Sequence, residues 1–329
     1  MDKRTFSGLL IAAVLGLFPA AAFFHFRSKT PELTGFRKQF QTMGTIASFT
    51  FYTADRESFV KACEIAKREF DRVMQIANLY APKSELSKLN SHAGNAPFSC
   101  TPEMWTLLMR AEQAWKESSG KFDITVKPLM NLWGFYRKRK QIPDAAEIKA
   151  VMNRIGFDKL QFDRKKHTVK FAVPGMALDL GGIAKGYALD CAANAVAAAG
   201  IGCGVLDLGG NLKMLPQVPP GKQFYTVGVR NPAKTESLLP LVLKLPGDSA
   251  VSTSGDYERF VTYGRRRYGH IIDPHSGTPE ARIAVTVTTK SALDADIFST
   301  SAYLGGRECA EKLEQLYPGS KFYFTPPEE

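Results

Sequence analysis

Residues 177–190, A-L-D-L-G-G-I-A-K-G-Y-A-L-D, form the stretch around which we expect the chain to be organised. Its apolar start predicts the buried end of a strand, the glycine pair predicts a turn, and the following residues predict a helix that ends at Gly200. Glycines in such a turn let backbone N–H groups approach a ligand closely, and the unpaired N–H groups of a helix start attract anions. The stretch therefore predicts either an ordinary strand–turn–helix or an anion-binding turn rimmed by Asp179 and Lys185.

The composition is that of a globular protein with a real core. The chain has 329 residues, of which 44% are hydrophobic and 23% charged. Its formal net charge is +11, but the basic residues are scattered, and the densest clusters, residues 137–140 and 265–267, are typical of solvated loops. Without a basic face and a readable motif we expect no nucleic-acid binding. A basic balance suits anionic partners such as phosphates or membrane surfaces.

The amino terminus has the pattern of an export signal. Two basic residues precede an uncharged run over residues 5–26, and two more follow it. Small residues after Pro19 offer a cleavage site, whereas Phe23 and Phe24 lengthen the apolar run to about 20 residues, about enough to span a bilayer. We therefore expect residues 1–30 to be a signal peptide or an uncleaved signal anchor. In both cases the remainder, residues 31–329, is expected outside the cytoplasm as one domain.

The cysteines do not suggest a disulfide framework, because they are few and dispersed. They are Cys63, Cys100, Cys191, Cys203 and Cys309. None lies near the apolar amino-terminal run, so we expect no lipid attached to a cysteine there. Most are expected to be small buried hydrophobic residues.

The order of predicted elements indicates an α+β fold with mixed, largely antiparallel sheets and packed helices, because strands, then helices, then strands follow one another. Three glycines near residue 202 follow a helix and lead into a strand, which is the wrong context for a dinucleotide-binding turn. The expected strands are residues 36–53 (a pair or one long strand), 120–126 after a turn, 160–163, 168–173, 225–229, 239–245, 250–253, 257–262, 268–272 and 283–287. The expected helices are residues 57–78, a short one after Ser84, 102–118, 144–155, 184–200 and 294–317, the last broken at Gly305-Gly306.

Two late segments carry candidate chemistry. His270 stands at a predicted strand edge, and Asp296 and Thr300 lie one turn apart on the same face of a predicted helix. A carboxylate and a hydroxyl at that spacing can ligate one hard cation such as Mg²⁺. The alternatives are that Asp294 or Asp296 caps the helix and that His270 is structural. A zinc site at His270 and a serine nucleophile are disfavoured, because further ligands and the nucleophile-elbow motif are absent from the sequence.

Seven segments, in this order along residues 40–324, together resemble the ApbE family, the FAD:protein FMN transferases. They are M-G-T (43–45), S-E-L-S-K-L-N (84–90), G-K-F-D-I-T-V-K-P-L-M-N-L-W-G-F (120–135), D-L-G-G-I-A-K-G-Y-A-L-D (179–190), S-T-S-G-D-Y (252–257), H-I-I-D-P-H-S-G-T-P (270–279) and D-A-D-I-F-S-T (294–300). The resemblance implies a Mg²⁺-dependent enzyme that splits FAD, moves FMN through a phosphoester bond onto a Thr or Ser hydroxyl of an acceptor protein, and releases AMP.

The resemblance also implies roles for individual residues. His270 matches the base that deprotonates the acceptor hydroxyl. The positions that match metal ligands are Gly182 (through its carbonyl), Asp296, Ser299 and Thr300. The positions that match FAD-binding residues are Met43, Tyr80, Lys121, Phe122, Asp123, Asp179, Lys185 and His270.

Two other functions remain open from the sequence. One is an FAD pyrophosphatase that yields FMN and AMP, and the other is a flavin-binding envelope protein without catalysis. The family usually modifies envelope redox complexes, so an envelope redox subunit with a Ser/Thr acceptor motif is the implied partner. Many relatives are lipoproteins, whereas membrane association of this chain would depend on residues 5–26.

Overall fold

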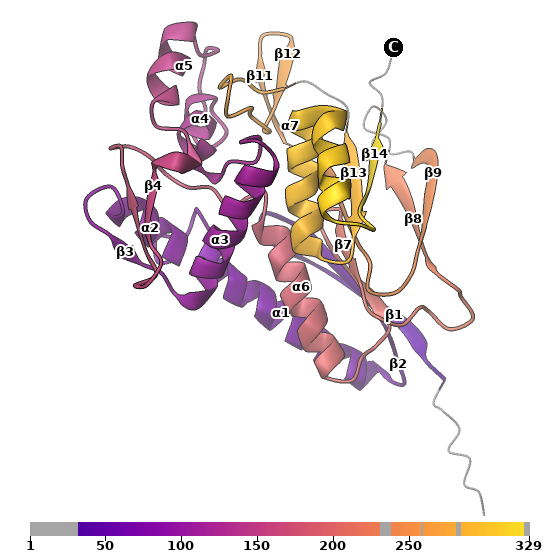
Figure 1. Cartoon of the computed structure of the whole chain (residues 1–329). Helices are drawn as coiled ribbons and strands as arrows, with labels where there is room; N and C mark the ends of the chain where they lie inside the picture. The colour runs from indigo at the N-terminus through magenta and orange to yellow at the C-terminus, as the bar shows by residue number, and fades with distance from the viewer. Residues whose placement is uncertain (1–31, 231–237, 258, 281–283, 326–329) are drawn as a thin grey trace, which may run out of the picture. The chain divides into compact units, whose positions relative to one another are not determined.

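A seven-stranded sheet runs through the computed structural model, which describes residues 32–230, 238–257, 259–280 and 284–325 (Figure 1). The strand order is β1-β2-β6-β7-β10-β13-β14, and every neighbouring pair is antiparallel. The strands are β1 (Thr34–Thr42), β2 (Thr45–Thr53), β6 (Gly204–Leu208), β7 (Asn211–Met214), β10 (Ala250–Ser254), β13 (Val285–Thr289) and β14 (Lys321–Phe324). The predicted α+β class with a largely antiparallel sheet is confirmed.

Three long helices pack with this sheet: α1 (Arg56–Ala77), α6 (Ala184–Ala198) and α7 (Ala292–Leu316) (Figure 1). Strand β2 contributes Phe49 and Phe51 to a core that also contains Phe70 of α1 and small residues of α6. The rings of Phe49 and Phe70 lie 5.4 Å apart in an edge-on arrangement, which adds to the stability gained from burying their area. This core is therefore built from every second residue of the strand and from helix residues that recur about every 3.6 positions.

Smaller elements surround this core. The helical ones are α2 (Glu85–His92), α3 (Pro102–Glu117), α4 (Lys127–Leu132), α5 (Ala145–Met152) and the 3₁₀ turns η1 (Ile124–Val126) and η2 (Phe157–Lys159). The small sheets are β3 (Phe98–Ser99), β5 (Thr168–Phe171) and β4 (Leu160–Asp163) in that order, β8 (Tyr225–Arg230) with β9 (Leu238–Leu245), and β11 (Phe260–Tyr263) with β12 (Arg266–Gly269). Residues Leu33–Glu329 make one compact unit.

The predicted helix starts are confirmed by their caps. Ser84 and Thr101 each accept a hydrogen bond from the backbone N–H three residues later, and Asp144 forms a complete capping box with Glu147. The predicted break in the last helix is also present, because Gly306 has φ 67° and ψ −158°. These features are local in sequence, and for this reason the residues alone predict them.

Two predicted strands are absent from the described structure. Residues 124–126 form a 3₁₀ turn because the Asp123 carboxylate accepts the N–H and hydroxyl of Thr125. Residues 177–180 are buried but not in a strand. Their backbone groups bond elsewhere: Leu178 exchanges two hydrogen bonds with the Asn90 side chain, and Asp179 N–H donates to the Ile124 carbonyl. The helix predicted after the glycine turn is confirmed as α6.

The predicted export segment, residues 1–30, lies outside the described residues. In the part of the chain that the structure describes, no helix combines the length and apolarity needed to cross a membrane.

Helices α6 and α7 lie in close backbone contact at Gly186. A Cβ atom there would lie 2.2 Å from the Ala292 carbonyl oxygen, a distance that no side chain tolerates. The backbone of α6 therefore touches the start of α7 directly, and this contact fixes how the two helices are placed.

We predict that Gly186→Ala lowers the free energy of unfolding by about 3 kcal/mol, because the added methyl group must push two helices apart. Urea unfolding of both proteins measures this difference. Gly94→Ala is the matched control, since a Cβ at Gly94 meets nothing within 4 Å, and it should change stability by less than about 0.5 kcal/mol. A Gly186→Ala protein as stable as the control would show that the helices have room to separate.

Candidate functional site

Asp296 is a buried carboxylate at the centre of the candidate site, with 4% of its surface exposed. Its Oδ2 accepts the Gly186 backbone N–H at 3.0 Å, and its Oδ1 accepts the side-chain amide of Asn211 at 2.9 Å. Burial raises the pKa of Asp296, while the positive charge of Lys185 and these hydrogen bonds oppose that rise. The Asp296 carboxylate is therefore placed by α6 and β7 as well as by its own helix.

Neither Asp294 nor Asp296 caps α7, so that alternative for these residues is wrong. Ser291 is the N-cap and accepts the N–H of Asp294, while Asp190 of α6 accepts the N–H groups of Ala292 and Leu293. The Asp296 carboxylate is therefore not needed to bond the first N–H groups of α7.

Hydroxyl groups line the α7 turn that follows Asp296. Ser299 Oγ lies 2.9 Å from Ser254 Oγ and 3.2 Å from Ser252 Oγ of β10, and Ser254 Oγ lies 3.2 Å from Thr300 Oγ1. Ser299 and Thr300 also donate to the Asp296 carbonyl, at 3.0 and 3.3 Å. These contacts form one polar network between α7 and β10.

The glycine turn reaches the same place. A Cβ built on Gly182 would lie 3.6 Å from Thr300 Oγ1 and 3.2 Å from the Phe122 ring. The structure thus brings Gly182, Asp296, Ser299 and Thr300 together. One carboxylate with hydroxyl and carbonyl oxygens is a hard donor set of the kind Mg²⁺ accepts. Within the described ranges, no group of three His, Cys, Asp or Glu side chains gathers as a metal cluster.

Lys185 is near enough to both Asp296 and His270 for its charge to act on each. Its positive charge acts on the carboxylates of Asp296 and Asp207 and on the imidazole of His270. Among the described residues no carboxylate oxygen lies within 4.0 Å of the Lys185 ammonium. A lysine held beside a helix start without a close carboxylate is suited to binding an anion.

His270 follows the last residue of β12 and is held by the chain opposite. Its backbone N–H donates to the Arg259 carbonyl at 3.1 Å, and its Nδ1 lies 3.2 Å from the same oxygen. The tautomer protonated at Nδ1 satisfies this contact and leaves a lone pair on Nε2. Burial, together with the positive charges of Arg259 and Lys185, lowers the pKa of His270 to about 4. The imidazole is therefore neutral near pH 7.

Two tyrosines and an arginine stand beside the glycine turn. Tyr136 donates a hydrogen bond to Asp179 Oδ2, and Asp179 Oδ1 accepts the N–H of Gly181 at 2.8 Å. The Tyr80 and Tyr136 rings lie edge-on at 5.9 Å, and Arg259 lies over the Tyr136 ring and donates to the Tyr80 hydroxyl at 3.1 Å. Tyr80 is 69% exposed, so its ring is open to a ligand.

The other predicted flavin-binding residues have structural contacts of their own. Lys121 pairs with Asp273 at 3.0 Å, and Phe122 is buried against Gly182. Both oxygens of Asp123 accept hydrogen bonds, from Thr125 and from the Phe157 N–H. Met43 occupies the β1–β2 turn with a φ of 49° and packs against two core clusters.

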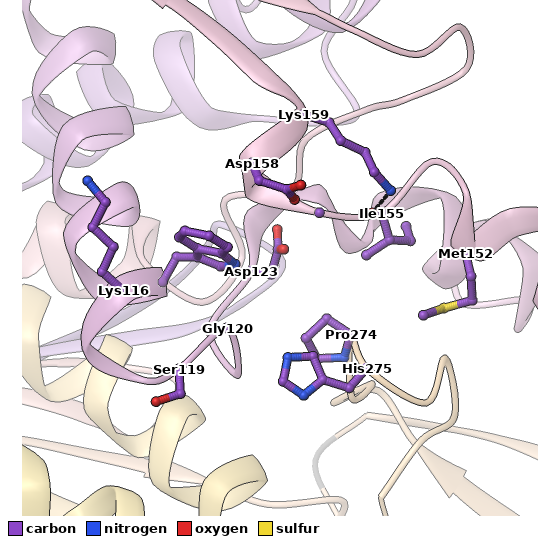
Figure 2. Close-up of a pocket in the computed structure, with 12 residues that line it drawn as sticks. Lys116, Ser119, Gly120, Asp123, Met152, Ile155, Asp158, Lys159, Pro274 and His275 are labelled. Carbon is purple, nitrogen blue, oxygen red and sulfur yellow. Dashed lines mark hydrogen bonds between the residues drawn. The ribbon is translucent and has the colours of Figure 1, made fainter.

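A cavity of about 710 Å³ borders the loop of residues 120–123 (Figure 2). Gly120, Asp123, Met152, Pro274 and His275 are among the residues that line it. Among the predicted site residues Asp123 is the one that borders this cavity. The cavity is therefore distinct from the place where Asp296, the glycine turn and Lys185 meet.

Five site residues were missed by the sequence interpretation. Tyr136 and Arg259 gave no signal of their own. Asn211 directly follows the second D-L-G-G tetrad, residues 207–210, so the repeated tetrad could have pointed to it. Ser252 and Ser254 alternate in a strand, and their spacing places both on the face that meets α7.

These features define a class of protein. Its members have an antiparallel α+β fold and one site that combines a glycine turn, a buried aspartate and a neutral histidine. The chain belongs to the ApbE family, whose profile matches residues 43–324.

Curated relatives and solved structures agree with this assignment. The chain is 32% identical over 260 residues to the FAD:protein FMN transferase of Treponema pallidum (strain Nichols), covering 75% of this chain and 72% of the relative. It is 29% identical over 275 residues to that of Vibrio cholerae serotype O1, covering 81% and 80%. The crystal structure of the ApbE protein from Thermotoga maritima MSB8 superposes with a TM-score of 0.81 at 26% identity, covering 88% and 94%.

We predict that acid destabilises the wild type more than His270→Gln. The pKa of His270 is about 4 in the folded protein, against 6.5 for a histidine exposed to water, so the unfolded chain takes up the proton first as pH falls below 6.5. Stability is then lost until the folded imidazole also protonates near pH 4. The wild type should therefore lose about 3 kcal/mol more than His270→Gln between pH 7 and pH 4.

Urea unfolding at several pH values measures this difference. His92→Gln, at an exposed position of α2, is the control and should keep the wild-type pH slope. A constant gap between the wild type and His270→Gln would mean that the imidazole is not held neutral.

Proposed function

We propose that this protein transfers FMN from FAD to a Thr or Ser hydroxyl of an acceptor protein and releases AMP. The family membership supports this, as does the activity for which its relatives are named, FAD:protein FMN transferase. The observation that carries the proposal is the convergence of Gly182, Asp296 and Thr300 beside Lys185. An acceptor oxygen forms a bond to the FMN phosphorus, and the phosphorus–oxygen bond to AMP breaks.

The proposed metal is Mg²⁺, and the oxygen donors fit it. Asp296, Thr300, Ser299 and the Gly182 carbonyl would hold it, because they combine one carboxylate with neutral oxygens. When bound, the ion would neutralise phosphate charge and stabilise the departing oxygen. The burial of the Asp296 carboxylate supports a metal-binding role, since a charge removed from water needs a compensating positive charge. The cation whose charge acts on this carboxylate in the structure is Lys185.

His270 is proposed as the base. A neutral imidazole with a free Nε2 lone pair can take the proton of the acceptor hydroxyl as the new phosphorus–oxygen bond forms, a contribution of roughly 10²–10⁴-fold. Lys185 and the N-terminal end of α6 would attract the FAD phosphates. Phosphoryl transfer depends mainly on such alignment and charge neutralisation.

The aromatic cluster is proposed to hold a ring of FAD. Tyr80 exposes 69% of its surface, and Arg259 and Tyr136 fix its position by a hydrogen bond and a ring contact. Aromatic rings stack well on flat ligands, and the Met43 thioether can make a soft contact with a ring.

We also propose that the enzyme works outside the cytoplasm. The charge pattern of residues 1–30 supports export, and residues 5–26 would provide membrane attachment if uncleaved. The acceptor would then be an envelope protein.

We predict that Asp296→Ala abolishes covalent flavinylation while the protein stays folded. The wild-type enzyme, incubated with FAD, Mg²⁺ and a candidate acceptor protein, should give a fluorescent acceptor band and an FMN mass adduct. Asp296→Ala should reduce the yield at least about 100-fold, because the carboxylate that would hold Mg²⁺ against the phosphate charge is lost. EDTA should have the same effect on the wild type.

Glu311→Ala is the matched control, because Glu311 is an exposed carboxylate on the same helix. It should flavinylate like the wild type. AMP release that proceeds equally without an acceptor would identify a pyrophosphatase, and FAD that stays intact in the active site would identify a binding protein. Both results would contradict the proposed transfer.

A further inference from the structure

The two densest basic clusters in the sequence, residues 137–140 and 265–267, lie on two segments that contact each other in the structure. The Tyr263 hydroxyl donates to the Trp133 carbonyl at 2.8 Å, and the Trp133 and Tyr268 rings lie 5.3 Å apart. These contacts attach the β11–β12 hairpin to the loop that leads into residues 137–140, and the hairpin lies next to α4 and α5 in Figure 1. Clusters about 130 residues apart in sequence thus become neighbours.

The register of the hairpin brings one cation of each cluster, Arg139 and Arg266, to the same neighbour, Tyr263. Arg266 is directly opposite Tyr263, so the two side chains share a face. Tyr263 lies close enough to Arg139 for the arginine charge to oppose the rise in the pKa of the tyrosine that burial causes. The basic rim, as we name it, consists of Arg137, Lys138, Arg139, Lys140, Arg265, Arg266 and Arg267.

Most of the basic rim is free for a partner. Six of its seven members are exposed, and Arg139 is the intermediate one. Within the described ranges Arg139 is also the member with an ion pair, to Glu147 at 2.5 Å. Arg267 lies over the Phe260 ring at 3.7 Å, and Phe260 is 42% exposed. Exposed arginine next to an exposed aromatic ring is a composition enriched in protein interfaces.

The basic rim leads directly to the proposed base. Strand β12 runs from Arg266 to Gly269, and His270 follows it. Four residues of strand span about 13 Å, so Arg266 stands about that far from His270 along the chain. An extended segment whose hydroxyl reaches His270 would place residues about four positions away over the rim.

We propose that the basic rim binds an acidic segment of the acceptor protein, flanking its Thr or Ser. The inference rests on the proposed transferase function and names the chemistry of its protein substrate. The acceptor is favoured over an anionic membrane because the rim is continuous with the residue that would meet the acceptor hydroxyl. FAD is not the ligand of the rim, since its proposed phosphate site lies at Lys185 and the glycine turn.

Binding of two labelled 16-residue peptides, followed by fluorescence anisotropy in 50 mM salt, tests the proposal. Each peptide carries one Thr, and one has four Asp residues centred four positions from it, where the other has Asn. The wild type should bind the Asp peptide about 10-fold more tightly, because several exposed charge pairs add small contributions at low salt. The assay contains no FAD, so its outcome is independent of whether transfer occurs.

The test variant is Arg137→Ser, Lys138→Ser, Arg265→Ser and Arg266→Ser combined, and it should lose the preference for the Asp peptide. The matched control, Arg68→Ser, Lys165→Ser, Lys166→Ser and Lys222→Ser combined, removes four exposed cations elsewhere and should keep it. Equal unfolding midpoints show that both variants are folded.

Three results would overturn the proposal. The first is that the wild type binds both peptides equally. The second is that both variants lose the preference to the same extent, which would mean that net charge and not the rim is responsible. The third is that vesicles with 30% phosphatidylglycerol bind through the same four residues while the peptides do not, which would make the rim a membrane surface.

Discussion

The contact between α6 and α7 at Gly186 is the constraint on which the site depends. Because residue 186 has no side chain, its backbone N–H can reach Asp296 Oδ2 at 3.0 Å, and the Ala292 carbonyl lies where a Cβ would stand. A buried carboxylate is costly unless it is hydrogen-bonded. The close approach of the two helices supplies one of the donors that makes it tolerable. It also sets the distance from the glycine turn, which begins α6, to Thr300 on α7.

One cation biases two titrating groups in the direction that the proposed chemistry needs. The charge of Lys185 opposes the rise in the pKa of Asp296 that burial causes, and it adds to the fall in the pKa of His270. The first effect favours an ionised carboxylate, and the second favours a neutral imidazole. A metal ligand and a general base require these same protonation states. The location of Lys185, one residue into α6, therefore connects the glycine turn to both groups.

Features governed by neighbours in sequence could be predicted, whereas features governed by distant partners could not. The Asp144 capping box and the break at Gly306 depend on residues within one helical turn. In contrast, residues 177–180 look like a strand, yet Asn90 takes both hydrogen bonds of Leu178 from 88 positions away. Apolar pattern alone does not reveal which partner satisfies a backbone group.

The candidate site shows the same division. Asp296 and Thr300 share a helix face, so their pairing followed from spacing. The motif order pointed to Gly182, but its contact with Thr300 required the structure. Asn211 was missed because its partner Asp296 lies 85 positions away, and a lone asparagine after a tight turn looks like turn chemistry.

Among the described residues, the groups that contact Asp296 and the adjoining hydroxyl network include no second carboxylate, and this has an electrostatic consequence. The neighbouring oxygens belong to Ser252, Ser254, Ser299 and Thr300, and all of them are neutral hydroxyls. A divalent cation bound by one carboxylate keeps a net positive charge, whereas each further carboxylate would reduce its attraction for a diphosphate. The hydroxyl network thus provides polarity without negative charge. The ammonium of Lys185 would act in the same direction on an anionic substrate bound at the proposed site.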